Sequence, residues 1–281
     1  MAQITPSKLI SLSSAVVCAF FVCQSCVHKY EFHLEQPKDT TVVIEGMITN
    51  ENKRQIVYVS QVSRYDNNRR APVSGAMVAV TASNDSTYYY FEDTLNLGTY
   101  VSEYPFIGVA GNIYYLNVKV NGSTYTAESN MLPVTPPEKI KFTRNESGML
   151  SIVHVAESFV ADNPAMYTVD LDWSGVDGYK EYDPKNTRAR LYYYSLTTVD
   201  VSQLFAPKIE KIEFPEGTQV IERKYSIDHN YELFLRSLLT ETQWCGGYFD
   251  EAHGNLHTNI SNNGAGYFSA CTIAADTVYA K

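Results

Sequence analysis

The stretch IYYLNVKV-NG-STYTAE, residues 113–128, decides the fold class of this chain. Its two arms, 113–120 and 123–128, alternate apolar and polar residues, which is the period of a half-buried β-strand. Asn121-Gly122 joins the arms, and Asn-Gly accepts the positive φ angles that a two-residue hairpin turn needs. The segment therefore predicts a β-hairpin.

Outward from this hairpin, residues 40–131 consist of short strand-like runs separated by turns. The runs are 41–47, 55–62, 77–80, 87–91, 100–102 and the two arms of the hairpin. So many short strands at this spacing predict an immunoglobulin-like or carboxypeptidase-regulatory-like β-sandwich. A Cys–Trp–Cys pattern of the antibody type is absent from the sequence. The segment 132–138 then holds three prolines in seven residues, which predicts a stiff linker and a domain boundary.

Residues 139–281 predict a second β-rich domain with one amphipathic helix. Strand-like runs cover 150–155, 165–173, 189–199, 219–227 and 266–274. Asp228 is a suitable N-cap, and apolar residues at helical spacing follow it from Tyr231 to Leu239. The predicted fold class is all-β: an N-terminal immunoglobulin-like sandwich followed by this second domain.

The N-terminus has the pattern of an export signal. Lys8 precedes an apolar run over 9–22, which is shorter than the roughly 20 residues that a membrane-spanning helix needs. The run ends at Cys23-Gln-Ser-Cys26, where a small residue before a cysteine resembles a bacterial lipobox. We expect a signal peptide over 1–25, a lipidated Cys26, and a tether over 26–39 that attaches the chain to the bilayer. Cys23 is the second choice for lipidation, and ordinary secretory cleavage is the alternative.

The net charge bears on the binding partners of the chain, and the cysteines bear on disulfide formation. The chain has 22 basic and 31 acidic residues and a formal net charge of −9, so nucleic acid is not an expected partner. Outside the signal and the anchor, Cys245 and Cys271 remain; they either form a disulfide or stay as free thiols, and the sequence favours neither alternative.

Two clusters have the composition of metal sites. Asp170, Asp172 and Glu181 have the bare spacing of an EF-hand loop, but a strand with alternate residues facing the core explains the same stretch with fewer assumptions. His253 and His257 lie in an acidic loop whose Gly-Asn step argues against the helix that would bring them together. We therefore expect no metal and no other cofactor.

Further surface features have a structural and a functional interpretation. The loop around 259–266 is explained by turn chemistry or by contact with a ligand or partner; its residues are Asn259, Asn262, Asn263, Gly264 and Gly266. Short Asp-Ser/Thr motifs resemble O-glycosylation sites at Thr40, Ser86, Thr94 and Thr277. The tyrosine runs at 88–90 and 192–194 place aromatic rings on both faces of their strands, where strand propensity or a binding surface explains them.

Motifs of common enzyme classes are absent: the sequence has no G-x-S-x-G, no H-E-x-x-H and no phosphate-binding glycine loop. We therefore expect a non-enzymatic protein, with a hydrolase of unrecognised site as an alternative.

The mature chain resembles domain-of-unknown-function family 4249, a group of Bacteroidetes envelope lipoproteins. The resemblance rests on VVIEGMIT at 42–49, PVSGAMVAV at 72–80, GTY at 98–100, residues 110–129, NYELFLRSL at 230–238 and NLHTNISNNGAGYFSA at 255–270. It implies an outer-membrane lipoprotein, on the periplasmic or the surface face, that serves a TonB-dependent transporter as an accessory or ligand-capturing partner. The family has no established catalytic residues to transfer. A surface adhesin or glycan-binding lipoprotein is the alternative function.

Overall fold

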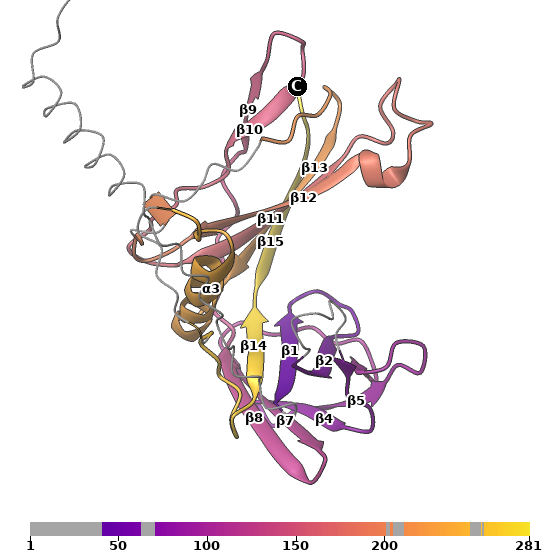
Figure 1. Ribbon diagram of the computed structural model, residues 1–281, viewed down its shortest axis with the longest axis vertical. Coiled ribbons are helices and arrows are strands. Elements are labelled where there is room, and N and C mark those ends of the chain that lie inside the picture. The colour runs from indigo at the N-terminus through magenta and orange to yellow at the C-terminus, as the bar shows by residue number, and fades with distance from the viewer. Residues whose placement is uncertain (1–40, 63–70, 201–202, 205–210, 248–253, 255) are drawn as a thin grey trace, which may run out of the picture. The chain divides into compact units, whose positions relative to one another are not determined.

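The computed structural model describes residues 41–62, 71–200, 203–204, 211–247, 254 and 256–281 (Figure 1). Three of the predicted site residues, Cys26, Thr40 and His253, lie outside these residues. The described part of the chain is all-β apart from its helical segments, which confirms the predicted fold class.

The first sheet is nine-stranded and nearly closes into a barrel. Its strands are β1 (Val42–Thr49), β2 (Ile56–Gln61), β3 (Ala71–Pro72), β4 (Met77–Ala82), β5 (Thr87–Glu92), β6 (Thr99–Ser102), β7 (Ile113–Val120), β8 (Ser123–Asn130) and β14 (Ala265–Cys271). The order across the sheet is β14-β1-β2-β6-β5-β4-β7-β8, and β3 pairs with β2.

Alternation along these strands builds the first core. On β7, Tyr114, Leu116 and Val118 are buried, while the residues between them are half-buried or exposed. The predicted hairpin forms between β7 and β8 with Val120 opposite Ser123. Both turn residues have positive φ, 52° at Asn121 and 76° at Gly122, as a tight hairpin turn requires.

Strand β14 is the unexpected member of this sheet. It comes from the C-terminal end of the chain and pairs in parallel with β1, from Val43 opposite Ala265 to Thr49 opposite Cys271. Beside it, Ser261 exchanges backbone and side-chain hydrogen bonds with Thr126 of β8. The two ends of the sheet order thus come together, and the first core is completed by residues more than 130 positions away in sequence.

The second sheet has four strands in the order β12-β11-β13-β15. These are β11 (Ala165–Asp172), β12 (Arg188–Ser195), β13 (Gln219–Ser226) and β15 (Ile273–Tyr279), with the 3-10 turn η1 (Pro184–Asn186) before β12. A separate pair, β9 (Lys141–Arg144) and β10 (Leu150–His154), contributes Leu150 to the second core, which is built around Val169, Leu171 and Phe214.

A single long run of chain belongs to both sheets. Strand β14 continues into β15 with only Thr272 between them (Figure 1). Thr272 is fixed: its amide donates to Ser226 Oγ, and its hydroxyl donates to the Leu132 carbonyl. The same carbonyl accepts a hydrogen bond from the Ser226 hydroxyl at 2.7 Å. The start of the proline-rich segment is therefore held against this shared strand.

Helix α3 (His229–Thr242) confirms the helix predicted after Asp228. The Asp228 side chain accepts the amide of Tyr231 as an N-cap, and its other oxygen accepts the Ser129 hydroxyl and the Asn130 amide from β8. Ser129 Oγ also accepts the amide of Ala270 on β14. One carboxylate therefore sets where the helix begins and anchors that end to the first sheet.

Candidate functional site

An open cleft lies beside α3 on the outer face of the first sheet, with a volume of about 420 Å³. We call it the α3 cleft. Its lining residues are Glu45, Gly46, Met47, Lys53, Arg54, Gln55, Ile56, Tyr58, Tyr231, Phe234, Tyr267 and Ser269. This volume falls within the roughly 300–1,000 Å³ range of small-molecule sites.

The floor of the α3 cleft is made by strand residues that alternate with the core. On β1, Ile44 and Ile48 are buried in the first core, so Glu45 and Met47 point to the opposite face. Glu45 stands opposite Tyr58 on β2 and opposite Tyr267 on β14. Three strands thus place Tyr58, Glu45 and Tyr267 in one row, and the Tyr267 ring also belongs to the wall of the cleft.

Three aromatic rings form the wall of the α3 cleft. The Tyr267 ring lies 5.0 Å from Tyr231 and 4.8 Å from Phe234, measured between centroids, with interplanar angles of 23° and 26°. Phe234 is only half-buried, so part of its ring faces solvent. The helix places both of its aromatics here because positions three apart share one helix face.

Burial acts on the two tyrosines of the wall. It raises the pKa of Tyr231 and of Tyr267 above the usual tyrosine value, which already lies well above neutral pH. The charged side chains that line the α3 cleft are Glu45 on the floor and Lys53 and Arg54 at the rim, where Lys53 forms an ion pair with Glu51 of the same loop.

Gln55 holds the rim in place. It is fully buried, and its amide nitrogen donates to the carbonyls of Thr49, Glu51 and Phe106, each at 3.2 Å. The loop between β1 and β2, which carries the two cations, is thereby fixed to the segment after β6. In chemical terms, the α3 cleft offers an apolar and aromatic surface with a cationic edge, which suits an amphipathic ligand or a segment of a protein.

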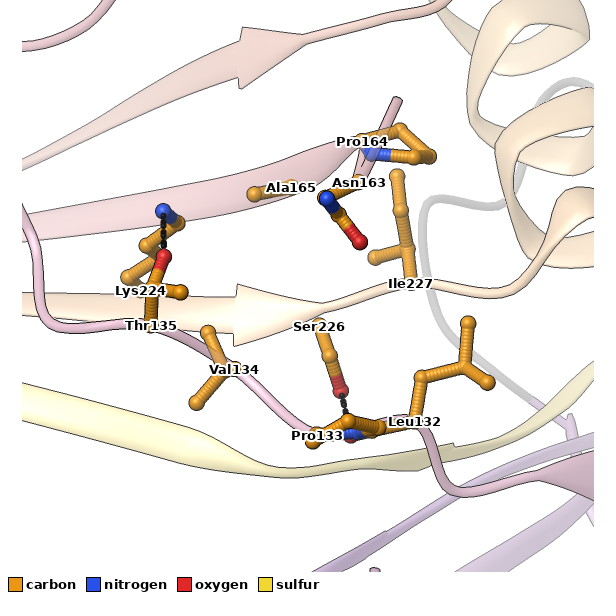
Figure 2. Close-up of a pocket in the computed structure, with 10 residues that line it drawn as sticks. All are labelled: Leu132, Pro133, Val134, Thr135, Asn163, Pro164, Ala165, Lys224, Ser226 and Ile227. Atoms are coloured by element: carbon orange, nitrogen blue, oxygen red, sulfur yellow. Dashed lines mark hydrogen bonds between the residues drawn. The ribbon is translucent and has the colours of Figure 1, made fainter. Parts of the chain in front are cut away.

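A second, smaller cavity of about 210 Å³ lies against the proline-rich segment (Figure 2). Figure 2 shows two hydrogen bonds between its lining residues: Lys224 Nζ donates to Thr135 Oγ1 at 2.9 Å, and Ser226 Oγ donates to the Leu132 carbonyl. Since these groups already hold the segment in place, the α3 cleft is the stronger candidate for binding.

The predicted EF-hand residues lie on a strand. Asp170 and Asp172 belong to β11, as alternation predicts. They alternate along this strand with Val169 and Leu171, which are buried in the second core. Asp170 pairs with Arg190 of β12 and Arg223 of β13, on either side of it. Glu181 is exposed in the following turn. The structure does not bring these carboxylates together as a loop would.

Ion pairing also accounts for Asp172. Burial alone would raise its pKa, but hydrogen bonds from Ser174 and Arg188 outweigh that effect and lower it. His257, the described member of the histidine pair, is half-buried, and its backbone amide donates to Ser237 Oγ. Among the described residues, no group of three or more His, Cys, Asp or Glu side chains is arranged to hold a metal ion.

Both cysteines are free thiols in the structure. Cys271, on β14, is fully buried, and burial raises the pKa of its thiol. Cys245 is half-buried after the end of α3, with its Sγ against the Thr242 carbonyl. Of the two alternatives left by the sequence, the structure has the unbridged one.

The loop at 259–266 has a structural role. Asn259 exchanges two hydrogen bonds with the backbone of Phe268 and donates a third to the Glu128 carbonyl, so it joins β14 to β8. Asn262 and Asn263 have φ of 56° and 55° in the turn that follows. The remaining glycines are close-packed: a Cβ would lie 2.5 Å from Ile260 at Gly264, and 2.2 Å from the Ile44 carbonyl at Gly266. Turn chemistry and close packing explain this loop.

The O-glycosylation candidates that the structure describes are exposed or half-buried residues. Thr94 is exposed in the β5–β6 turn, Thr277 is exposed on β15, and Ser86 is half-buried in the β4–β5 turn. Modification at these positions stays a prediction.

The tyrosine runs do place rings on both strand faces. On β5, Tyr90 is buried and Tyr88 stacks on Phe106 at 3.7 Å, whereas Tyr89 and Phe91 are each 60% exposed. The outward rings are available for contact with a partner.

Fold and site together define an all-β chain with an aromatic cleft on its surface. The chain belongs to the family described as "Domain of unknown function (DUF4249)", whose model matches residues 27–277. This confirms the resemblance found in the sequence. In the part of the chain that the structure describes, no helix is long and apolar enough to cross a membrane.

Comparison with other proteins adds little beyond the family. No curated protein matches the chain. Among solved structures, a cytokine receptor complex matches 65% of this chain and 82% of its own at 10% identity and a TM-score of 0.24. The FN1-FN3 domains of chicken CNTN1 match 67% of this chain and 61% of their own at 14% identity and a TM-score of 0.29. Similarities this weak carry no argument about function.

Proposed function

We propose that this chain is a lipid-anchored, non-enzymatic binding protein of the outer membrane that serves a TonB-dependent transporter as an accessory subunit. In this role the α3 cleft captures a ligand or a segment of the partner. The observation that carries the proposal is the α3 cleft itself: an aromatic wall and a cationic rim, both fixed by buried contacts. Family membership and the lipobox-like Cys26 support the location.

The shape of the site favours binding over turnover. A catalytic site needs a nucleophile or a general base within hydrogen-bond reach of a reacting group. The lining of the α3 cleft is mainly apolar and aromatic, with the one carboxyl group of Glu45 on its floor and Lys53 and Arg54 at its rim. The arrangement provides contact area and charge complementarity, which are the properties of a recognition site.

The partner is tested by affinity purification of the full chain, tagged at its C-terminus, from native membranes in mild detergent. We expect a TonB-dependent barrel in near-equal amount. Recovery of the lipoprotein alone, under conditions that keep known outer-membrane assemblies intact, would contradict the proposed partnership.

The α3 cleft is tested in the same purification with a matched pair of variants. Phe234→Ala removes a half-exposed ring from the wall, whereas Tyr192→Ala removes a ring that is 48% exposed on β12, away from the α3 cleft. We expect Phe234→Ala to reduce recovery of the barrel, or of a small molecule released on denaturation, by roughly 5–30-fold, which corresponds to about 1–2 kcal/mol. Equal losses in both variants would show that the α3 cleft is not the site.

The second candidate function is a surface adhesin or glycan-binding lipoprotein. The observation in its favour is the pair of outward rings on β5, Tyr89 and Phe91, since exposed aromatic faces stack on sugars and on protein partners. Binding of the purified chain to a glycan array, lost in Tyr89→Ala and independent of any transporter, would favour this function.

A further inference from the structure

The turn between β5 and β6 presents two leucines to solvent. Leu95 is 90% exposed and Leu97 is 58% exposed. Single exposed leucines are ordinary on protein surfaces. Two in one six-residue turn, with Phe91 60% exposed at the end of the preceding strand, form a concentrated apolar projection. We call residues 93–98 the leucine turn.

The leucine turn is held in shape by two carboxylates. Asp93 accepts the Leu95 amide at 2.9 Å through one oxygen and the Asn96 side-chain amide at 2.8 Å through the other. Glu92 accepts the Gly98 amide at 2.9 Å and the Gly75 amide at 3.0 Å. These bonds fix the backbone on both sides of the leucines.

The ionised state of both carboxylates strengthens this arrangement. The pKa of Asp93 is lowered by the hydrogen bond from the Asn96 side chain and then by the Leu95 amide. The pKa of Glu92 is lowered by the Gly98 amide and then by the Gly75 amide. The leucines are thus displayed on a preorganised loop, so little conformational entropy is lost when they are buried against a partner.

Charge around the leucine turn restricts what that partner can be. A hollow beside the turn is lined by Phe91, Val101, Thr94 and Ser102, by the acids Glu92, Asp93 and Glu103, and by Arg54. Among the residues that the structure describes here, three carboxylates against one guanidinium give this surface a negative sign. It would be repelled by an anionic lipid surface and attracted to a basic protein surface.

We propose that the leucine turn is a docking element that inserts Leu95 and Leu97 into an apolar pocket, rimmed by lysine or arginine, on a partner protein. The inference goes beyond the proposed function because it names a second surface and the chemistry of what binds there. It does not require that the partner be a transporter.

The experiment places the photoreactive residue p-benzoylphenylalanine at position 95 of the full chain in native membranes, and at position 153 as a control. Val153 is 51% exposed on β10 and lies in a different sheet. After irradiation, adducts are identified by mass spectrometry of the linked peptides. A Leu95→Ser/Leu97→Ser variant is compared with Val153→Ser for the yield of the same complex under chemical cross-linking.

We expect a protein adduct from position 95 but not from position 153, on a partner peptide that combines apolar residues with lysine or arginine. The double serine variant should lower the yield of the complex at least 10-fold, while Val153→Ser leaves it unchanged. The melting temperature of the double serine variant should match that of the unmodified chain, because neither leucine is buried.

Three outcomes would overturn the inference. A phospholipid adduct at position 95 would make the leucine turn a membrane contact. No adduct above the level of position 153, or a complex that survives the double substitution, would leave the leucines without a docking role. An adduct to a protein that is not a TonB-dependent barrel would support the docking element, and the transporter partnership would still be decided by the membrane purification.

Discussion

Replacing Phe268 with alanine should destabilise the first sheet, although Phe268 lies near the C-terminus of the chain. Phe268 is on β14, opposite Gly46 of β1, and none of its side chain is exposed. Removing a fully buried phenylalanine side chain costs about 3–5 kcal/mol, from lost burial and from the cavity left behind. With a urea dependence of about 2 kcal/mol per molar, the unfolding midpoint should fall by roughly 2 M.

The assay is urea unfolding followed by far-UV circular dichroism and by tryptophan fluorescence. Trp173 lies in the second core, whereas Trp244 packs with α3 and with Tyr267 and Cys271 of β14, so fluorescence reports on the second core and on the α3 side of the first sheet. Because β14 continues into β15, we expect both signals to shift together in Phe268→Ala. The control Phe91→Ala, on β5 of the same sheet but 60% exposed, should change stability by no more than about 0.5 kcal/mol. A Phe268→Ala midpoint equal to that of Phe91→Ala would refute the assignment of β14 to the first core.

Three further predictions concern single residues. Glu222 is buried on β13, and burial, with a smaller effect of the nearby Asp276 charge, raises its pKa to about 7. Between about pH 4.5 and 7 the folded state therefore holds a proton that the unfolded state has lost, so stability falls as the pH rises through this range. Thermal unfolding should show Glu222→Gln to be more stable than the unmodified chain by about 1–3 kcal/mol at pH 8 and by much less at pH 5. In urea unfolding, Gly266→Ala should lower the free energy of unfolding by at least about 2 kcal/mol more than Gly122→Ala does. Both glycines have positive φ, but of the two only Gly266 has backbone atoms within 4 Å of the added Cβ. Equal losses in the two variants would contradict the close approach of β14 to β1. Alkylation of the native chain with peptide mapping should label Cys245 and leave buried Cys271 unlabelled, whereas protection of both until reduction would indicate a disulfide.

Local patterns predicted most of the elements. Alternation and the Asn121-Gly122 turn give β7 and β8, and the Asp228 cap with the apolar spacing behind it gives α3. In each case the deciding contacts lie within a few residues of one another, so one stretch of sequence contains the whole signal. The strand expected over 266–274 is also present, divided into β14 and β15 at Thr272.

The pairing of β14 with β1 could not be predicted in the same way. A parallel pair of strands is not joined by a short hairpin turn, so no local sequence motif predicts it. The partners Gly46 and Phe268 are also 222 positions apart in the sequence. The domain boundary predicted at 132–138 stays a prediction. The structure shows that β14, from the segment 139–281, belongs to the sheet formed by strands of 40–131.

The α3 cleft was hidden for the same reason. It combines Glu45 and Tyr58 with Phe234 and Tyr267, and only the tertiary fold brings these residues together. Gln55 gave no signal either, since a glutamine at the start of an alternating run looks like an ordinary exposed residue, whereas it is fully buried and fixes the cationic rim.

A lipid anchor on the mature chain is tested most directly by the intact mass of the protein extracted from membranes. We predict a polypeptide that begins at Cys26 and carries a lipid on that residue, and we expect Cys26→Ser to move the protein out of the membrane fraction. An unmodified chain cleaved at another position, or a Cys26→Ser variant that stays in the membrane fraction, would contradict it.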